Sequence, residues 1–226
     1  MQPQDTLARL DQLIQSRSIL NHPFYVAWQD GELSAEQLAI YARVYYPHVA
    51  AFTGYLNLAL RSAEDEIVRA ELETNLDDEL NNPKAHKELW LDFAEGLGVS
   101  RWTLPNEARH PAAENIVNTF ERLSRIDSAQ ALAALYVYES QQPEVSRLKS
   151  DGLQELYGVD DPKTLAYFEV HAETDIEHRQ GERQALEICL ENGASAEEVL
   201  ASAEQALDAY WGLLDGNCEE ADIPAG

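Results

Sequence analysis

Residues 161–193 read DPKTLAYFEVHAETDIEHRQGERQALEICLENG, and this stretch has the periodicity of one long helix. Asp161 followed by Pro162 is a typical helix start, because proline at the first helical position costs no hydrogen bond and aspartate can cap free amides. Gly193 is a typical stop. The rest of the chain continues this pattern, with apolar residues at helical spacing and no convincing alternating run that would indicate a strand.

Three side chains with metal-binding chemistry lie on one face of this predicted helix. His171, Asp175 and His178 are separated by four and then three positions, so at about 100° per residue they project in nearly the same direction. Two imidazoles and one carboxylate form the ligand set that non-haem iron and similar divalent metals prefer. A solvated helix face is the alternative, since acidic residues are common in this chain.

The same periodicity predicts an all-α, single-domain bundle of seven to eight helices over residues 1–215, with a frayed tail at 216–226. Ser34 with Gln37, and Ser195 with Glu198, form capping boxes. The segment HPFYVAWQDGELS (22–34) is interpreted as a loop, and Pro143 is expected to kink a helix. The predicted helices lie at about 5–20, 34–60, 63–80, 84–97, 113–125, 128–157, 161–193 and 195–214.

The composition excludes several classes of function. The 226 residues include 16 Lys+Arg against 41 Asp+Glu, a formal net charge of −25, which leaves no basic surface for nucleic acid or for an anionic membrane. No apolar run approaches the roughly 20 residues of a membrane span, and the N-terminus lacks the pattern of a signal peptide. Two cysteines without zinc-like spacing are typical of a reduced, cytoplasmic protein. A homodimer is compatible with such a bundle.

A second pair of candidate ligands lies earlier in the chain. Glu79 and His86 are seven residues apart and would share a face of a continuous helix, although Pro83 lies between them. A third element is Glu139, at the end of the apolar stretch LAALYVYE. A carboxylate buried there requires a partner, either a bound cation or an arginine.

Together these positions supply three histidines and three carboxylates. Helical bundles commonly hold dinuclear metal sites between facing helices, and three carboxylates against two divalent cations leave a net charge of +1 for an incoming ligand to offset. The sequence therefore predicts a site for two divalent ions at Glu79, His86, Glu139, His171, Asp175 and His178.

The order of these ligands in an all-α chain resembles the haem-oxygenase-like di-metal oxidases, whose fold is shared with the TenA and PqqC proteins. The phrases YESQQPEVSRLKSDGLQELYG and TLAYFEVHAETDIEH are most similar to the CADD-like branch, whose members are proposed p-aminobenzoate synthases of folate biosynthesis. Those enzymes are thought to excise the product from one of their own tyrosines, with a lysine as amino donor. The resemblance implies that Tyr25 is the sacrificed residue, that Lys149 is the donor, and that Tyr41 and Tyr138 relay radicals.

The residues alone leave these four roles open. Lys149 is one of only four lysines, and a desolvated lysine can lose its proton and act as a nucleophile, but a surface lysine is the plain alternative. Tyr25 and the other tyrosines can equally be core residues.

Three functional hypotheses follow. The first is a single-turnover di-metal oxidase that forms p-aminobenzoate from Tyr25 and Lys149, with O2 and an external reductant as co-substrates. The second is a multiple-turnover oxidase of a diffusible amine, amino acid or fatty acid in the same fold. The third is a metal-independent interaction protein whose acidic surface binds a basic partner.

Overall fold

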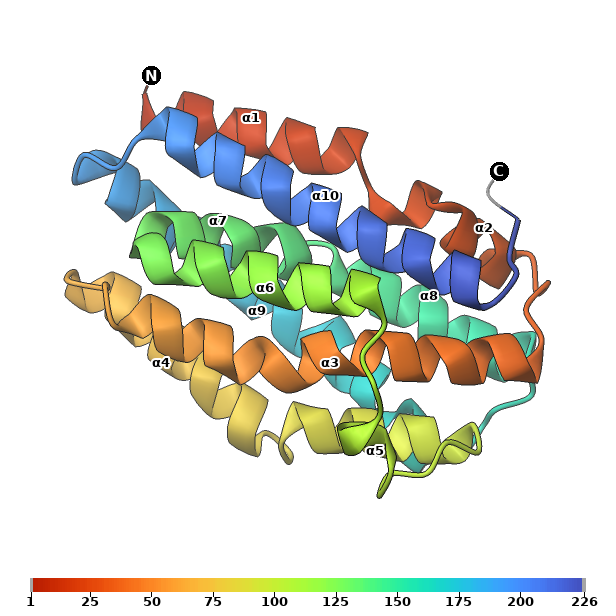
Figure 1. The fold of residues 1–226 in the computed structure, drawn as a ribbon. Coiled ribbons are helices and arrows are strands. Elements are labelled where there is room, and N and C mark those ends of the chain that lie inside the picture. Colours follow the sequence, from red (N-terminus) through yellow and green to blue (C-terminus); the bar gives the residue numbers. More distant parts are fainter. Residues whose placement is uncertain (1, 225–226) are drawn as a thin grey trace.

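The computed structural model describes residues 2–224, which contain ten α-helices, two short 3₁₀ turns and no β-strand (Figure 1). The prediction of an all-α fold is therefore confirmed for the described part of the chain. The helices are α1 (Pro3–Ser16), α2 (Pro23–Gln29), α3 (Ala35–Leu60), α4 (Glu66–Asn81), α5 (His86–Gly96), α6 (Pro111–Ile126), α7 (Ser128–Glu139), α8 (Gln142–Glu155), α9 (Pro162–Glu191) and α10 (Ala196–Glu220). None of these helices is both long and apolar enough to cross a membrane.

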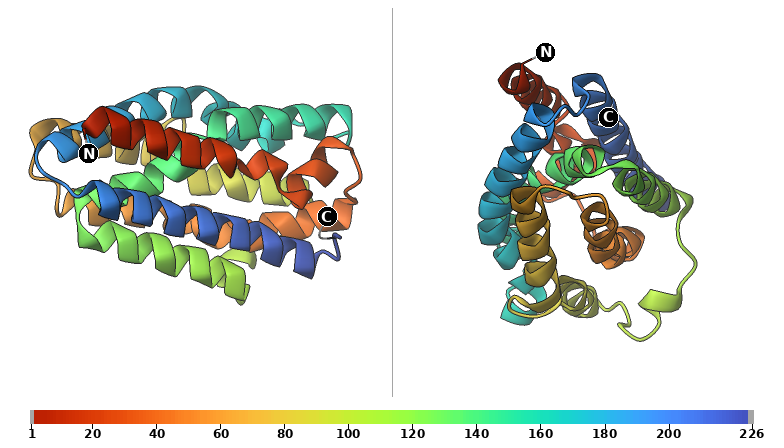
Figure 2. Two further views of the ribbon diagram at one scale, coloured as in Figure 1. Left: turned by 90° about the horizontal axis from the view of Figure 1, so that it is seen from above. Right: turned by 90° about the vertical axis from the view of Figure 1, so that its left-hand side faces the viewer.

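The helix axes are roughly parallel or antiparallel to one another, so the right panel of Figure 2 views most of the helices end-on. Helix α7 packs against α6, α9 and α10. Every residue from 131 to 139 is buried, because the sequence ALAALYVYE lets neighbouring helices approach it from all sides. Any polar group on this helix is thereby held away from water, and Glu139 is the charged one.

Several helix starts occur where the sequence predicts them. Ser34 and Gln37 form the complete capping box of α3, and the side chain of Ser195 accepts a hydrogen bond from the Glu198 amide of α10. Asp161 caps α9, with proline at the first helical position. These local signals fix where the long helices begin, and hence which of their faces point into the bundle.

The segment predicted as a loop at 22–34 contains the helix α2, so that prediction is wrong for residues 23–29. His22 is its N-cap, because Nδ1 accepts a hydrogen bond from the Phe24 amide, and Pro23 is its first residue. Phe24, Tyr25 and Trp28 are buried from this helix. Two turns of helix thus carry Tyr25 into the core.

The structure also differs from the prediction at two boundaries. Where a kink is expected at Pro143, the helix ends at Glu139 and α8 begins at Gln142, with proline at its second position, which needs no amide donor. Helix α10 continues beyond Leu214 to Glu220, and Cys218 is buried, so the predicted frayed tail is wrong for residues 216–220. Residues 225–226 of that tail lie outside the described residues.

Candidate metal centre

Three buried side chains from three helices meet inside the bundle. Glu79 lies near the end of α4, His86 begins α5, and His171 lies within α9. Glu79 Oε1 is 3.0 Å from His86 Nδ1 and 3.8 Å from His171 Nε2. One potential ligand atom from each of the three lies within 4.8 Å of the others. This convergence is what a shared metal ion requires.

Glu79 and His86 meet across the break between two helices. The interruption predicted at Pro83 is present, since α4 ends at Asn81 and α5 begins at His86, so the two residues do not share the face of one helix. The Asn82 carbonyl accepts a hydrogen bond from His86 Nε2 at 3.0 Å. The break in the helix therefore turns the imidazole back toward the carboxylate of Glu79.

Both imidazole rings of this group are oriented by backbone carbonyls. His86 Nε2 donates to Asn82, and His171 Nδ1 donates to the Tyr167 carbonyl at 2.7 Å. Because a carbonyl oxygen only accepts, these nitrogens carry the protons, and the opposite nitrogens face Glu79. Rings held in this way are typical of metal-binding histidines. The donor set of two imidazoles and one carboxylate fits a divalent iron.

Electrostatics within this group favour the ionised carboxylate. Burial opposes ionisation of Glu79, but the charge and hydrogen bonds of His86 and His171 outweigh it and lower its pKa to about 2. Burial likewise opposes the charged form of His86, whereas Glu79 raises the pKa of that imidazole. Without a metal, a protonated histidine thus neutralises the carboxylate in the way a cation would.

The other three predicted ligands are buried beside this group. Glu139, at the end of α7, accepts hydrogen bonds from Asn75 Nδ2 on both of its oxygens, at 3.0 and 2.9 Å. His178 Nδ1 lies 3.5 Å from Asp175 Oδ1, and its Nε2 lies 3.0 Å from Asp78 Oδ2. Asp175 Oδ2 has no hydrogen-bond partner. These residues form a second acidic group, looser than the first.

The pKa directions show that this second group is electrostatically coupled. Burial opposes the charge of His178, but Asp175, Glu139 and Asp78 raise its pKa to about 10. Burial raises the pKa of Glu139 to about 7, aided by Asp175 and opposed by His178. One imidazolium among several carboxylates leaves this group with an excess of negative charge.

One further carboxylate belongs to this region and was not predicted. Glu182, on α9, has an exposed fraction of 0%, and neither of its carboxylate oxygens has a hydrogen-bond partner. Burial raises its pKa well above the usual range, and the neighbouring Glu139 raises it further. The signal was present in the sequence, because Glu182 lies four positions after His178 and eleven after His171, which places it on the same helix face.

A different kind of buried group lies among aromatic rings. The Nζ atom of Lys149, on α8, donates to the Tyr41 hydroxyl at 2.6 Å and lies 5.3 Å from the centre of the Tyr25 ring. Tyr45 and Phe168 lie at similar distances. The lysine is only 1% exposed, and burial lowers its pKa well below the usual range. Within residues 2–224, no carboxylate forms an ion pair with it.

The tyrosine hydroxyls around Lys149 are linked in part by hydrogen bonds. Tyr45 donates to Tyr138 at 3.2 Å and shares a 2.8 Å hydrogen bond with Tyr210, which also accepts from Gln142. The Tyr25 hydroxyl is buried near those of Tyr41 and Tyr210, but no hydrogen bond of regular geometry satisfies it. The structure thus brings the four residues singled out by resemblance, Tyr25, Tyr41, Tyr138 and Lys149, into one aromatic compartment.

Aromatic rings also connect this compartment with the candidate metal centre. The ring of His171 lies 4.1 Å from that of Tyr167, which lies 4.8 Å from Trp90, measured between ring centres. Trp90 stacks on Tyr45 at 5.0 Å, and Tyr45 lies 5.2 Å from Tyr41. The two groups therefore share one continuous core.

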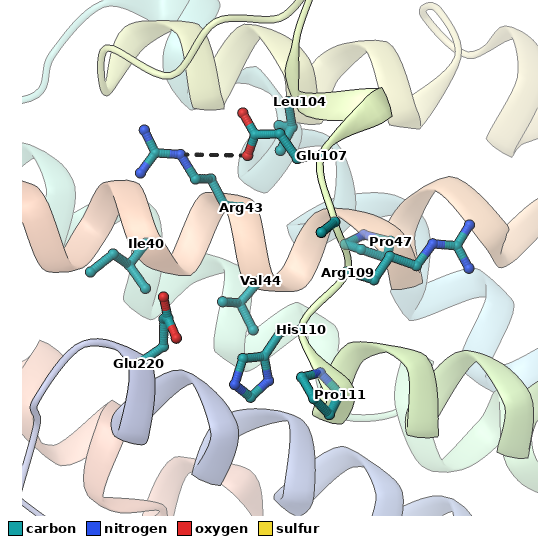
Figure 3. Close-up of a pocket in the computed structure, with 11 residues that line it drawn as sticks. Ile40, Arg43, Val44, Pro47, Leu104, Glu107, Arg109, His110, Pro111 and Glu220 are labelled. Atoms are coloured by element: carbon teal, nitrogen blue, oxygen red, sulfur yellow. Dashed lines mark ion pairs between the residues drawn. The ribbon is translucent and has the colours of Figure 1, made fainter.

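A surface pocket of ≈340 Å³ lies elsewhere, between α3, the segment before α6 and the end of α10 (Figure 3). Arg43 and Glu107 form an ion pair across its rim at 3.8 Å. Its lining residues are Ile40, Arg43, Val44, Pro47, Leu104, Glu107, Ala108, Arg109, His110, Pro111 and Glu220. No predicted site residue is among them.

Two curated relatives align over nearly the whole chain. A protein of Nitrosomonas europaea named 4-aminobenzoate synthase is 38% identical over 218 residues, covering 92% of this chain and 89% of that protein. A protein of Chlamydia trachomatis with the same name is 40% identical over 210 residues, covering 92% and 90%. Such identity over the full length indicates common descent, which is consistent with the resemblance found in the sequence.

The fold has a counterpart among solved structures. A TenA homologue from Pseudomonas syringae superposes with a TM-score of 0.80 at 19% identity, covering 95% of this chain and 92% of that chain, so the TenA-like bundle predicted from the sequence is confirmed. Residues 39–211 match the family model described as iron-containing redox enzyme, in the haem-oxygenase group. The chain belongs to this family of haem-oxygenase-like, iron-containing redox enzymes.

Proposed function

We propose that this enzyme is an oxygen-dependent 4-aminobenzoate synthase with a dinuclear metal centre, and that it takes its product from its own Tyr25 with Lys149 as amino donor. The name of the relatives at 38–40% identity supports the product. The single observation that carries the internal route is the placement of Lys149, a buried amine without an acidic partner, 5.3 Å from the centre of the Tyr25 ring.

Two divalent ions, Fe/Fe or Fe/Mn, would be held by the six residues predicted from the sequence. Glu79, His86 and His171 form the tighter group for one ion. Glu139, Asp175 and His178 are the donors for the other. When bound, these ions would activate O2 and supply the oxidising equivalents, with electrons from an external reductant.

The position of the nitrogen in 4-aminobenzoate defines what must happen to Tyr25. The ring carbon that bears the hydroxyl gains the nitrogen of Lys149 and loses its oxygen, which leaves as water. Cβ separates from Cα and is oxidised to the carboxylate carbon, with O2 as the oxidant and O2 or water as the source of its two oxygens. The Nζ–Cε bond of the lysine must also break to release the product. Each protein molecule can therefore act once, because both residues are consumed.

Burial prepares the two reacting groups for this chemistry. Desolvation lowers the pKa of Lys149, which favours the neutral amine with a free lone pair. Desolvation also raises the pKa of Tyr25 and Tyr41 well above the usual range, so both phenols keep their protons. Oxidation of either tyrosine must therefore remove a proton together with an electron.

Tyr41 and Tyr138 are the candidate relays between the metal centre and Tyr25. Tyr41 accepts the hydrogen bond of Lys149, and Tyr138 accepts that of Tyr45. Glu139 follows Tyr138 directly in α7, so one short segment contributes to both the aromatic compartment and the acidic group. An oxidising equivalent formed at the metals would thus travel through rings that are already in contact.

The decisive experiment uses protein grown with ring-labelled tyrosine. The metal-free protein is loaded anaerobically with Fe(II), or with Fe(II) and Mn(II), and then receives O2 and a reductant without any small-molecule substrate. We expect labelled 4-aminobenzoate, at no more than one per chain, and a matching loss of intact protein mass. Tyr25→Phe should form none, whereas Tyr46→Phe, on α3 and less deeply buried, should behave as wild type.

Two outcomes would contradict this proposal. Full product formation by Tyr25→Phe would exclude the internal route. Many turnovers with an added amine, amino acid or fatty acid, without loss of protein mass, would instead identify a conventional oxidase with a diffusible substrate.

A further inference from the structure

Glu182 is a buried carboxylate that the six-ligand centre does not use. It lies on α9 one turn after His178 and has no exposed surface. Its two oxygens lack any hydrogen-bond partner in the described residues. A buried, unpaired carboxylate is costly to a fold, so such a group requires a compensating partner.

The neighbours of Glu182 do not supply that partner. Glu139 of α7 is its strongest electrostatic neighbour, followed by Glu71 of α4 and Asp175 of its own helix. The adjacent arginine, Arg183, donates to Asp11 of α1 instead. The charged groups that act most strongly on Glu182 are thus acids. The imidazole of His178, one turn earlier, faces Asp175 and Asp78, so this region holds more carboxylates than cations and a bound cation would offset the excess.

The surroundings of Gly181 also indicate that acidic side chains cluster beside Glu182. A Cβ at this position would collide with the carboxylate of Glu71, so the absence of a side chain lets that carboxylate lie against α9. Helices α4, α7 and α9 therefore all direct carboxylates toward the same end of the metal centre.

We propose that Glu182 is a fourth carboxylate ligand of the metal centre and binds the second cation together with Glu139, Asp175 and His178. This inference rests on the proposed two-ion centre. With Glu182 included, four carboxylates balance two divalent cations, so the loaded centre is neutral, whereas three carboxylates leave a net charge of +1. Neutrality matters because the site is fully enclosed by the bundle.

The competing role for Glu182 is a hydrogen-bonding acid that only orients Glu139. The two roles differ in what a glutamine can replace. The amide of Glu182→Gln can still donate to Glu139, so it preserves an orienting hydrogen bond, but it carries no negative charge and is a poor ligand for a hard divalent ion.

The test is a titration of the metal-free protein with Mn(II), read by metal content after equilibrium dialysis and by the electron paramagnetic resonance spectrum. We expect wild type to bind two ions with a spin-coupled spectrum. Glu182→Gln should keep the first ion and bind the second at least about tenfold more weakly, giving the spectrum of an isolated ion. Glu177→Gln, on the exposed face of the same helix, is the matched control and should bind as wild type.

A second variant, Glu182→Met, keeps the test valid if the buried amide of Glu182→Gln disturbs folding. It replaces the acid with an apolar side chain of similar length, so neither a charge nor an amide remains buried. Both variants should melt at or above the temperature of the metal-free wild type, since each removes an uncompensated buried acid. Two tight ions in Glu182→Gln would overturn the ligand role and leave the two-ion centre intact. A single ion in wild type would overturn the two-ion centre itself.

Discussion

The two buried polar regions of this bundle respond to burial in opposite ways. In the metal centre, His86 and His171 compensate the carboxylate of Glu79, so its pKa falls to about 2 although the group is enclosed. In the aromatic compartment, Lys149 has only rings and a phenol around it, and its pKa falls well below the usual range. The comparison shows that a buried group stays charged where compensating charges and hydrogen bonds surround it. Where these are absent, burial favours the neutral form.

The two regions nevertheless share the same helices. Tyr138 faces the aromatic compartment, and the next residue, Glu139, accepts hydrogen bonds from Asn75 in the metal centre. On α9, Tyr167 contacts Trp90 one turn before His171 contacts Glu79. The charged and the neutral environments are thus separated by about one helical turn.

The largest effect should come from removing the central carboxylate of the metal centre. Glu79→Gln leaves His86 and His171 without the negative charge they face, so affinity for the first Fe(II) or Mn(II) ion should fall by at least about 100-fold. Equilibrium dialysis measures this directly. Glu73→Gln, exposed on the same helix, should bind normally; wild-type affinity in Glu79→Gln would show that the three-residue group is not the metal site.

Substitution of Lys149, in the aromatic compartment, should abolish activity without a loss of stability. Lys149→Met should abolish 4-aminobenzoate formation while the melting temperature of the metal-free protein stays the same or rises, because a desolvated amine is replaced by an apolar chain of similar length. Lys149→Arg should also be inactive, since arginine does not lose its proton. Lys87→Met is the surface control. Product formed by Lys149→Met would assign the amino donor elsewhere.

How far the sequence predicts these regions depends on whether the signal is local. Helix starts at Ser34 and Asp161 follow from side chains that bond amides a few residues away, so they were predictable. The helix that carries Tyr25 was missed because the seven residues of α2 are too few to show periodicity beside Pro23 and Gly31.

The sequence predicted which residues form the candidate site better than it predicted how those residues come together. Spacing identified His171, Asp175 and His178, and the same spacing extended by one turn would have included Glu182. The break between α4 and α5 was predicted from Pro83, but the sequence did not show that this break would bring His86 back toward Glu79. Which neighbours surround Lys149 depends on contacts between α2, α3 and α8, and a single sequence holds no record of such pairings.

The pH dependence of stability should distinguish the two buried regions, because the metal centre holds ionised groups at neutral pH and the aromatic compartment does not. His178, facing Asp175 on its own helix, Asp78 and Glu71 of α4 and Glu139 of α7, has its pKa raised to about 10. Its stabilisation is complete below about pH 6.5 and is lost as the pH rises toward 10.

The two glutamates complete this pH profile of the metal-free protein. Glu139, with its pKa raised to about 7, destabilises the fold as the pH rises from about 4.5 to 7, whereas Glu79 loses its stabilisation only as the pH falls from about 4.5 toward 2. Melting temperatures should therefore peak at about pH 4.5 and decline toward pH 9. Bound Mn(II) should oppose that decline, because it takes neutral imidazole and ionised carboxylate. A flat profile in the metal-free protein would contradict the coupling of these groups.

Crowding the aromatic compartment should cost moderate stability. A Cβ at Gly152 would lie 2.6 Å from Nε1 of Trp28, whose ring is fully buried against Phe24 and Tyr41. The ring cannot move without displacing its neighbours, so Gly152→Ala should lower the free energy of unfolding by about 1–2 kcal/mol, net of the helix preference for alanine. Urea denaturation measures the change. Unchanged stability would mean that this compartment is less tightly packed than the structure indicates.

The smallest effect should come from the equivalent substitution at the metal centre. A Cβ at Gly181 would meet only the end of the Glu71 side chain, which is partly exposed and whose pKa is raised by burial. That carboxylate can rotate toward water at little cost, so Gly181→Ala should leave the metal-free protein unchanged or stabilise it by up to about 0.5–1 kcal/mol. The same urea titration compares it with Gly152→Ala. A loss as large as that of Gly152→Ala would show that Glu71 is a fixed part of the metal centre, and that the acidic region is as rigid as the aromatic one.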